Sequence, residues 1–227
     1  MATKVFPNNV SLVVLISGDG SNLQAIIDAI NNDQLEAEVK AVISNRSTAH
    51  GLKRAVKANI PTHVIDHKDY PTREAFDQAM IQIIDPLQPD LIILAGFMRI
   101  LSEHFINHYQ HRLINVHPSL LPKYKGLNTH QQAIDNKDSI HGSSVHFVSH
   151  ELDSGPVVIQ AEIAVLKTDS AKDLAAKVLN VEHKIYPLAI KMFAQKRISF
   201  DGKQIQLDNK PLKKPLRWKN DKLTEIN

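Results

Sequence analysis

The feature of this sequence that most constrains its fold is a pair of continuous apolar runs, each about as long as one strand. They span Ser11–Ser17 and Asp90–Phe97, and neither carries a polar side chain between its ends. Strands with one face in solvent alternate apolar and polar residues, whereas parallel strands that are covered on both faces are apolar throughout. The two runs therefore predict parallel strands buried between helices.

Segments with helical spacing separate strand-like runs through the first half of the chain. In the segment from Asn22 to about Asn32, for example, apolar residues recur every three or four positions. An order in which strands and helices alternate predicts a parallel sheet with helices on both faces. The expected helices are 22–32, 48–59 and 73–84, and the expected strands are 11–17, 39–44, 61–66 and 90–97.

The second half of the chain changes character. Two apolar runs, Gly142–Ser149 and Pro156–Val165, are separated by only six residues. That connection is too short for a crossover helix, so these strands should be antiparallel. A long helix is expected from Ser170 to about Gln195, capped by Asp169 or Ser170. A last hairpin at 197–207 turns at Asp201-Gly202.

The predicted fold class is α/β, with a mostly parallel, twisted sheet and helices on both faces. The N-terminal half is Rossmann-like, and the C-terminal half has antiparallel strands. We expect one domain over residues 1–202 and a basic C-terminal extension over 203–227, which has seven basic and three acidic residues. The rest of the chain is then near −1, because the whole carries +3. A basic tail on a neutral body is not typical of a nucleic-acid-binding domain. The extension is predicted to be solvated, with weak attraction of anions as the alternative.

Composition excludes several classes of protein. The chain has no cysteine, so disulfides and thiolate chemistry are not available. No apolar run is long enough to span a bilayer. The N-terminal residues lack the pattern of a signal peptide, and a cytoplasmic location is therefore expected.

The loop Ser17–Asn22 connects the first expected strand to the first expected helix. Its two glycines allow a ligand to approach the backbone, and it presents the N–H groups of a helix N-terminus, where anions bind. We interpret the loop as a phosphate site, with a tight turn capped by Ser21 as the alternative. A dinucleotide is disfavoured, because Leu23 replaces the third glycine of that fingerprint and no acid follows the second strand.

Asn115 and His117 are the best candidates for chemistry. They follow a short apolar run and stand two residues apart, so in an extended segment their side chains point to the same face. A carboxylate is available at Asp153, in the turn-rich segment Glu151–Pro156. Asp153 either closes an Asx-turn to Gly155 or faces His117, where it would raise the pKa of the imidazole and fix its tautomer.

The chain has twelve histidines, but none of their spacings is typical of a metal site, so no metal is predicted. His141 and His146 flank an expected strand and are weaker candidates than His117. Three more fit a solvated helix face, namely His104, His108 and His111.

Five motifs resemble the phosphoribosylglycinamide formyltransferases, the folate-dependent formyltransferases of purine biosynthesis. The similarity runs from about Leu12 to Phe193. The Asn-Val-His-Pro-Ser-Leu-Leu-Pro run alone is shared with methionyl-tRNA formyltransferase and formyltetrahydrofolate deformylase, and it becomes specific together with the glycine-rich loop. The motifs are Ser17–Gln24, Ala95–Leu101, Asn115–Pro122, His141–His146 and Glu151–Pro156.

The resemblance implies transfer of the formyl group of 10-formyltetrahydrofolate to the amine of glycinamide ribonucleotide (GAR), which yields formyl-GAR and tetrahydrofolate. The amine would attack directly through a tetrahedral intermediate. The Asn115 amide would donate to the oxyanion, a contribution of ~3 kcal/mol in known sites, and a protonated His117 would relay protons. No metal, nicotinamide, nucleic acid or membrane is expected to take part. The chain is expected to be a monomer or a weak homodimer.

The same resemblance implies roles for individual residues. The catalytic group would be Asn115, His117 and Asp153. The phosphate of GAR would be held by Gly20, Ser21 and Asn22, with further GAR contacts from Leu179, Asn180, Val181 and Glu182. The folate site would comprise Arg73, Met98, Arg99, Ile100, Leu101, Asn115, Ser149, His150, Glu151, Leu152 and Asp153.

Three positions depart from the family pattern. The folate loop of the family reads Asp-Glu-Leu-Asp-Gly-Gly-Pro, whereas here His150 and Ser154 replace its first aspartate and first glycine. His150 adds a titratable group near the pterin site, and Ser154 could restrict the loop. Asn128 stands where relatives often have histidine.

Other functions are weighed against this one. A methionyl-tRNA formyltransferase would need a further C-terminal domain, and the ~30 residues after the long helix are too few for it. A deformylase would be expected to carry an N-terminal regulatory domain, and only ten residues precede the first strand. A catalytically silent nucleotide-binding module is disfavoured by the Asn115, His117 and Asp153 set.

Overall fold

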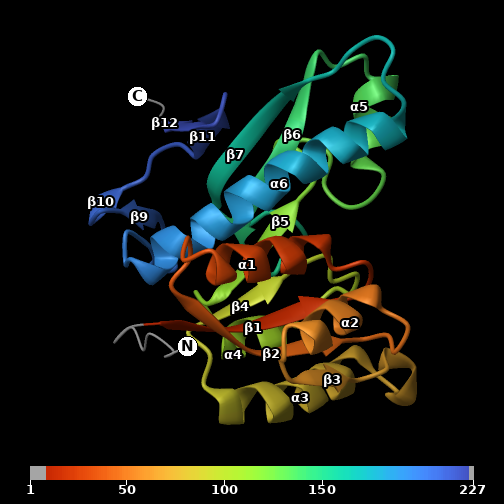
Figure 1. The fold of residues 1–227 in the computed structure, drawn as a ribbon, viewed down its shortest axis with the longest axis vertical. Coiled ribbons are helices and arrows are strands. Elements are labelled where there is room, and N and C mark those ends of the chain that lie inside the picture. Colours follow the sequence, from red (N-terminus) through yellow and green to blue (C-terminus); the bar gives the residue numbers. More distant parts are fainter. Residues whose placement is uncertain (1–8, 225–227) are drawn as a thin grey trace.

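The computed structural model describes residues 9–224, and over these the main element is a nine-stranded sheet in the order β12-β11-β7-β6-β5-β4-β1-β2-β3 (Figure 1). The first five strands are parallel to one another, as predicted. The elements of this half are β1 (Val10–Ile16), α1 (Ser21–Asn31), β2 (Ala37–Ser44), α2 (His50–Lys57), β3 (Thr62–Val64), η1 (His67–Asp69), α3 (Arg73–Ile84), η2 (Asp85–Leu87), β4 (Leu91–Leu94), α4 (Glu103–His108) and β5 (Leu113–His117).

The second half adds antiparallel strands to this sheet. β6 pairs antiparallel with both β5 and β7, which confirms the orientation predicted from the short connection. Ser170 caps α6 through a capping box with Asp173. The elements are α5 (Thr129–Asp135), β6 (Ile140–Phe147), β7 (Val157–Ala164), α6 (Ala171–Ala194), β8 (Ile198–Phe200), β9 (Ile205–Leu207), β10 (Lys210–Pro211), β11 (Leu216–Lys219) and β12 (Lys222–Thr224).

Helices cover both faces of the sheet, and this explains why β1 is apolar throughout. Leu12 and Val14 belong to a core that includes residues of α1 and α6. Val13 and Leu15, which point to the opposite face, belong to a second core with residues of α3 and α4. Figure 1 shows α1 and α6 on one side of the strands and α3 on the other. Each apolar residue of β1 is thus buried by one helical layer or the other, whereas Ser11 near its start is half-buried.

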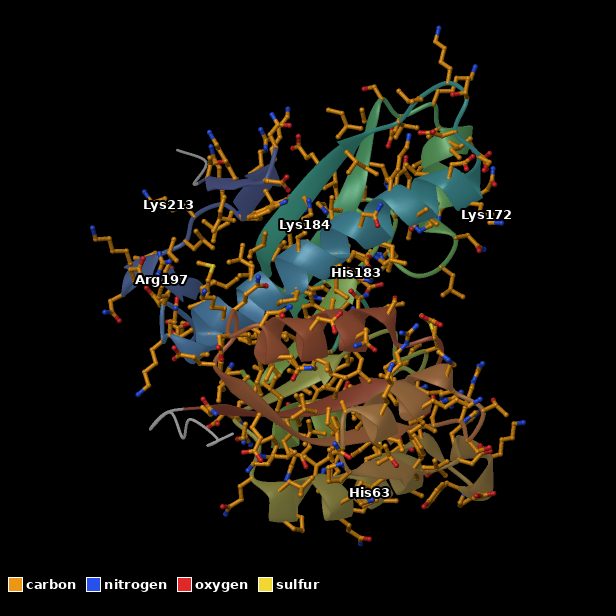
Figure 2. The ribbon with its side chains drawn as sticks, in the orientation of Figure 1. His63, Lys172, His183, Lys184, Arg197 and Lys213 are labelled. Carbon is orange, nitrogen blue, oxygen red and sulfur yellow. The ribbon has the colours of Figure 1, made fainter. Side chains whose placement is uncertain are left out.

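The C-terminal extension packs against the domain. β9 pairs with β8, so a division of the chain at residue 202 would separate the two strands of one hairpin. β11 pairs with β7 and extends the main sheet, and Leu216 at its start is buried. Lys213 lies on the segment that leads from β10 to β11 (Figure 2). The prediction of a separate extension is therefore wrong, because its strands pair with β7 and β8. Its lysines are exposed, as a solvated segment requires, whereas Ile205, Leu207 and Leu216 are buried.

The strand order reverses between β1 and β4, because the chain first runs outward through β2 and β3 and then returns to the other side of β1. In open α/β sheets, ligands bind beyond the carboxyl ends of the strands at such a point. Two hydrogen bonds join the loops that leave the sheet there: Ser17 N donates to Gly96 O at 3.2 Å, and Met98 N donates to Ser17 Oγ at 2.7 Å. The expected phosphate loop and folate segment are therefore in direct contact.

Candidate functional site

The loop between β1 and α1 presents the N-terminus of α1 at the carboxyl edge of the sheet. Gly20 is the N-cap residue, with φ of 75°, and no side chain caps the helix. The alternative of a turn capped by Ser21 is therefore wrong. A Cβ atom on Gly20 would lie 2.6 Å from Gly51 Cα, so the close approach of α2 also requires glycine. Without a capping side chain, the N–H groups of the first turn are left for a ligand, as an anion site requires.

Asn22, in the first turn of α1, is buried and faces α6. Its Nδ2 donates to Glu182 Oε2 at 2.9 Å, whereas its Oδ1 is buried without a partner among the described residues. Ser143 Oγ lies 3.2 Å from Glu182 Oε1 and 2.8 Å from His117 O. Burial raises the pKa of Glu182, against hydrogen bonds from Asn22 and Ser143 that lower it. A short polar chain thus connects the phosphate loop to the end of β5.

Asn115 on β5 lies opposite His146 on β6 in the sheet register. His146 Nδ1 donates to Phe147 O at 2.9 Å, because a carbonyl oxygen can only accept. Its Nε2 then carries a lone pair and accepts from Asn115 Nδ2 at 3.1 Å. This pattern requires a neutral ring, and burial lowers the pKa of His146 to about 4. The contact turns the Asn115 amide so that its second N–H stays available to another oxygen.

His117 is buried at the end of β5, and both of its ring nitrogens face acceptors. Its Nε2 donates to Tyr124 O at 2.8 Å, and its Nδ1 lies 3.4 Å from Asp153 Oδ2. Asp153 Oδ2 also accepts from Gly126 N at 2.9 Å. The imidazole therefore lies between a backbone carbonyl and a buried carboxylate, and these two contacts fix the orientation of its ring. Asp153 therefore faces His117, as one of the two sequence interpretations expected.

A small cavity of about 100 Å³ opens next to these groups. It lies between the segment after β4 and the loop 149–155, and Asn115, His146 and Asp153 form its inner end. Of the residues predicted to bind folate, Arg99, Ile100, Leu101, Asn115, Ser149, His150, Leu152 and Asp153 line it. Arg73, Met98 and Glu151 do not line this cavity. Arg73 begins α3, and Met98 is exposed.

Of the residues on α6 that were predicted to bind GAR, Glu182 contacts the first turn of α1 directly. Glu182 is buried against Asn22, at the junction of the phosphate loop and β6. Of the three residues that precede it, Asn180 is exposed, and Leu179 and Val181 are half-buried. His183 lies on the side of α6 that faces α1 (Figure 2), in a groove that also includes Ser21 and Arg54. The structure thus joins Glu182 to the phosphate loop by a direct contact.

Sequence reasoning underrated His146 and did not single out Ser143 or Tyr124. Their roles depend on the β5–β6 register and on the course of the loop 118–128, which periodicity does not specify. One signal in the sequence was that His146 and Ser144 are two residues apart on one strand, so their side chains point to the same face of the sheet. That spacing is the same as the spacing of Asn115 and His117.

The two buried histidines of β6 should make stability depend on pH. Burial lowers the pKa of both His141 and His146 to about 4, from an ordinary value of 6.5. Because the folded values are depressed, their contribution is complete above pH 6.5 and is lost as the pH falls toward 4. Each should cost about 2 kcal/mol at pH 5. Urea unfolding of His141→Gln at pH 7 and pH 5 should show a smaller loss than the wild type, with His104→Gln on α4 as the control. An equal loss in His141→Gln would contradict this assignment.

Within residues 9–224 no group of three His, Asp or Glu side chains has an arrangement that could hold a metal ion. In the same residues, no helix has both the length and the apolarity to cross a membrane.

Comparison with known proteins agrees with this architecture. A family model described as formyl transferase matches residues 10–190. The chain is 52% identical to the phosphoribosylglycinamide formyltransferase of Escherichia coli over 202 residues, which cover 89% of this chain and 95% of that one. The solved phosphoribosylglycinamide formyltransferase of Coxiella burnetii, in complex with CHES, superposes with a TM-score of 0.86 at 49% identity and covers 89% of this chain and 95% of that one. Glycinamide ribonucleotide transformylase 1 of Symbiobacterium toebii gives 0.86 at 37% identity, with coverage of 91% and 98%.

Proposed function

The chain belongs to the formyl transferase family, and we propose that it transfers the formyl group of 10-formyltetrahydrofolate to the amine of GAR. Formyl-GAR and tetrahydrofolate are the products, in a step of de novo purine biosynthesis. The observation that carries this proposal is the convergence of Asn115, His117 and Asp153 between a small cavity and the N-terminus of α1. That placement brings a folate and a phosphorylated amine to one reaction centre.

Each substrate has a site that fits its chemistry. The phosphate of GAR lies at Gly20, Ser21 and Asn22, where uncapped N–H groups favour an anion. The buried carboxyl of Glu182 accepts a hydrogen bond from the substrate or from Asn22. The pterin of the folate enters the cavity lined by Leu101, Asn115, Leu152 and other residues of the predicted folate set.

The reaction proceeds by direct attack of the GAR amine on the formyl carbon. The free N–H of the Asn115 amide donates to the oxygen as it becomes an oxyanion, because His146 holds the amide in that orientation. His117 supplies a proton to the departing folate nitrogen, and Asp153 stabilises the positive charge of the imidazole. The proton released by the amine restores His117, directly or through water. No covalent bond to the protein forms.

The decisive experiment supplies the purified protein with 10-formyltetrahydrofolate in the presence and absence of GAR. Loss of the formyl group that depends on GAR supports transfer. Loss without GAR would support a deformylase, and no loss in either case would support a binding module.

Gly20→Val tests the phosphate site. Its Cβ would lie 2.6 Å from the backbone of Gly51, and φ of 75° disfavours a β-branched residue, so the loop must move. We expect the KM for GAR to rise on the order of ten-fold or more, because one charge-assisted hydrogen bond contributes about 1.5–3 kcal/mol. The KM for folate should change much less. An unchanged KM for GAR would exclude this loop as the phosphate site.

The remaining expectations rest on the sequence alone. They are a cytoplasmic location, catalysis without a metal, and a monomer or weak homodimer. Gel filtration and metal analysis of the purified protein test the second and third.

A further inference from the structure

The loop 149–155 forms one wall of the folate cavity, and it has a second groove behind it. That groove has a volume of about 680 Å³ and is lined by Glu151, Ser154 and Gly155 of the loop. Its other walls come from the segment at 121–125 and from the C-terminal segment at 203–215. Because the loop lies between a cavity and a groove, few side chains pack against its tip, Glu151–Ser154. The position of the tip must therefore depend on a few specific contacts.

The base of the loop is held by the backbone. Gly155 is packed so closely against the backbone of Phe147 that no side chain fits there, and Phe147 N donates to Pro156 O at 3.0 Å. The tip of the loop lies against the tripeptide Tyr124–Gly126, which contacts it through hydrogen bonds. Tyr124 O accepts from His117, and Gly126 N donates to Asp153 Oδ2. The residue between them, Lys125, extends its side chain to the loop itself.

Lys125 makes two contacts with the loop. Its Nζ lies 3.0 Å from Glu151 Oε1, and it donates to Ser154 Oγ at 2.5 Å. Ser154 Oγ in turn donates to Leu152 O at 3.0 Å, so this hydroxyl has both a donor and an acceptor. The hydrogen bond from Lys125 lowers the pKa of Glu151, as expected for a carboxylate paired with an ammonium group. A glycine at position 154, as in the family pattern, would supply neither contact.

We propose that Lys125 is a positioning residue that clamps the folate loop through Glu151 and Ser154. This inference rests on the proposed function and deepens it, since the clamp acts on the wall of the folate cavity and on the loop that carries Asp153. Ser154 is then not an obstacle in the loop but the acceptor that makes the Lys125 contact possible. The clamp holds the loop where it forms the wall of the cavity and thereby favours folate binding, without contacting the GAR site.

The test compares Lys125→Met with the wild type. Lys125 and Glu151 are both exposed, so their contacts should change the affinity only modestly, by about five-fold. We expect the Kd for tetrahydrofolate, measured by calorimetry, to rise about five-fold. The KM for GAR and the urea unfolding midpoint should stay at the wild-type values. Lys125→Arg should restore most of the folate affinity.

Two further variants test whether a loss of folate affinity comes from the contacts of Lys125 or from the loss of a positive charge in general. Lys123→Met removes a neighbouring ion pair, to Asp138, that does not contact the folate loop, and it should bind tetrahydrofolate as the wild type does. Ser154→Gly should weaken binding less than Lys125→Met, and the double variant should be no weaker than Lys125→Met alone. Additive losses would show that the two residues do not act through one contact and would overturn the proposal.

The outcomes for the two proposals are distinguishable. A wild-type protein that transfers no formyl group to GAR would refute the proposed function. A wild type that transfers it, together with Lys125→Met of unchanged folate affinity, would refute the clamp alone. A Lys125→Met variant that weakens GAR and folate equally would also refute the clamp, because the effect would then not pass through the folate loop.

Discussion

Asn115→Ala is expected to lower kcat about 100- to 1000-fold, because removal of one oxyanion donor has an effect of this order in other enzymes. The Kd for tetrahydrofolate should change far less, since the donor acts mainly when charge develops on the formyl oxygen. The substitution also leaves His146 Nε2 buried without its partner, at a cost of about 1–3 kcal/mol in the free energy of unfolding. Single-turnover kinetics and urea unfolding measure the two effects separately.

The control for this variant is Asn107→Ala, the same change at an exposed position on α4. It should keep the wild-type kcat. If Asn115→Ala retained wild-type turnover, Asn115 would have no part in the chemistry, and the orientation imposed by His146 would be structural only.

Asp153→Asn is expected to lower kcat about 100- to 10,000-fold, the range of general acid–base catalysis. In the structure the same oxygen, Asp153 Oδ2, accepts from Gly126 N and faces His117 Nδ1. A carboxamide of the same size can place its oxygen there, but it carries no negative charge. The positive imidazole that forms during proton transfer then loses its stabilising partner. Measurement of kcat at saturating concentrations of both substrates isolates this effect from binding.

Asp169→Asn supplies the comparison, because Asp169 pairs with Lys177 at the start of α6 and lies outside the candidate site. It should lower stability slightly and leave kcat unchanged. Comparable kcat values for Asp153→Asn and the wild type would mean that His117 does not need the carboxylate.

The sequence predicted the grouping of the candidate side chains better than their surroundings. Asn115 and His117 are two residues apart on a strand, and strand geometry alone places them on one face. Asp153 was found as a carboxylate in a turn-rich loop, with its partner left open between Gly155 and His117. His146 was underrated, because its contact with Asn115 depends on which residues of β5 and β6 are opposite each other.

The contacts of Glu182 and Lys125 could not be predicted from local sequence patterns. Glu182 is on the buried side of α6, where a carboxylate would be unfavourable without partners. Its partners, Asn22 and Ser143, come from α1 and β6 and are far away in the chain. Lys125 is an ordinary charged loop residue in the sequence, and only the fold brings it to Glu151 and Ser154.

The order and type of the elements in the first half follow from short stretches of sequence. Burial on two faces leaves a continuous apolar run, and burial on one face of a helix leaves a periodic one, so both signals are local. The C-terminal extension was not recognised as part of the sheet, since β11 pairs with β7, which precedes it by dozens of positions, and Leu216 is buried there. Long-range pairing also set the contact of His117 with Asp153, the register of Asn115 with His146 and the clamp at Lys125. These depend on the relative placement of distant segments, which is selected by the packing of the whole core and is not encoded in the periodicity of any one segment.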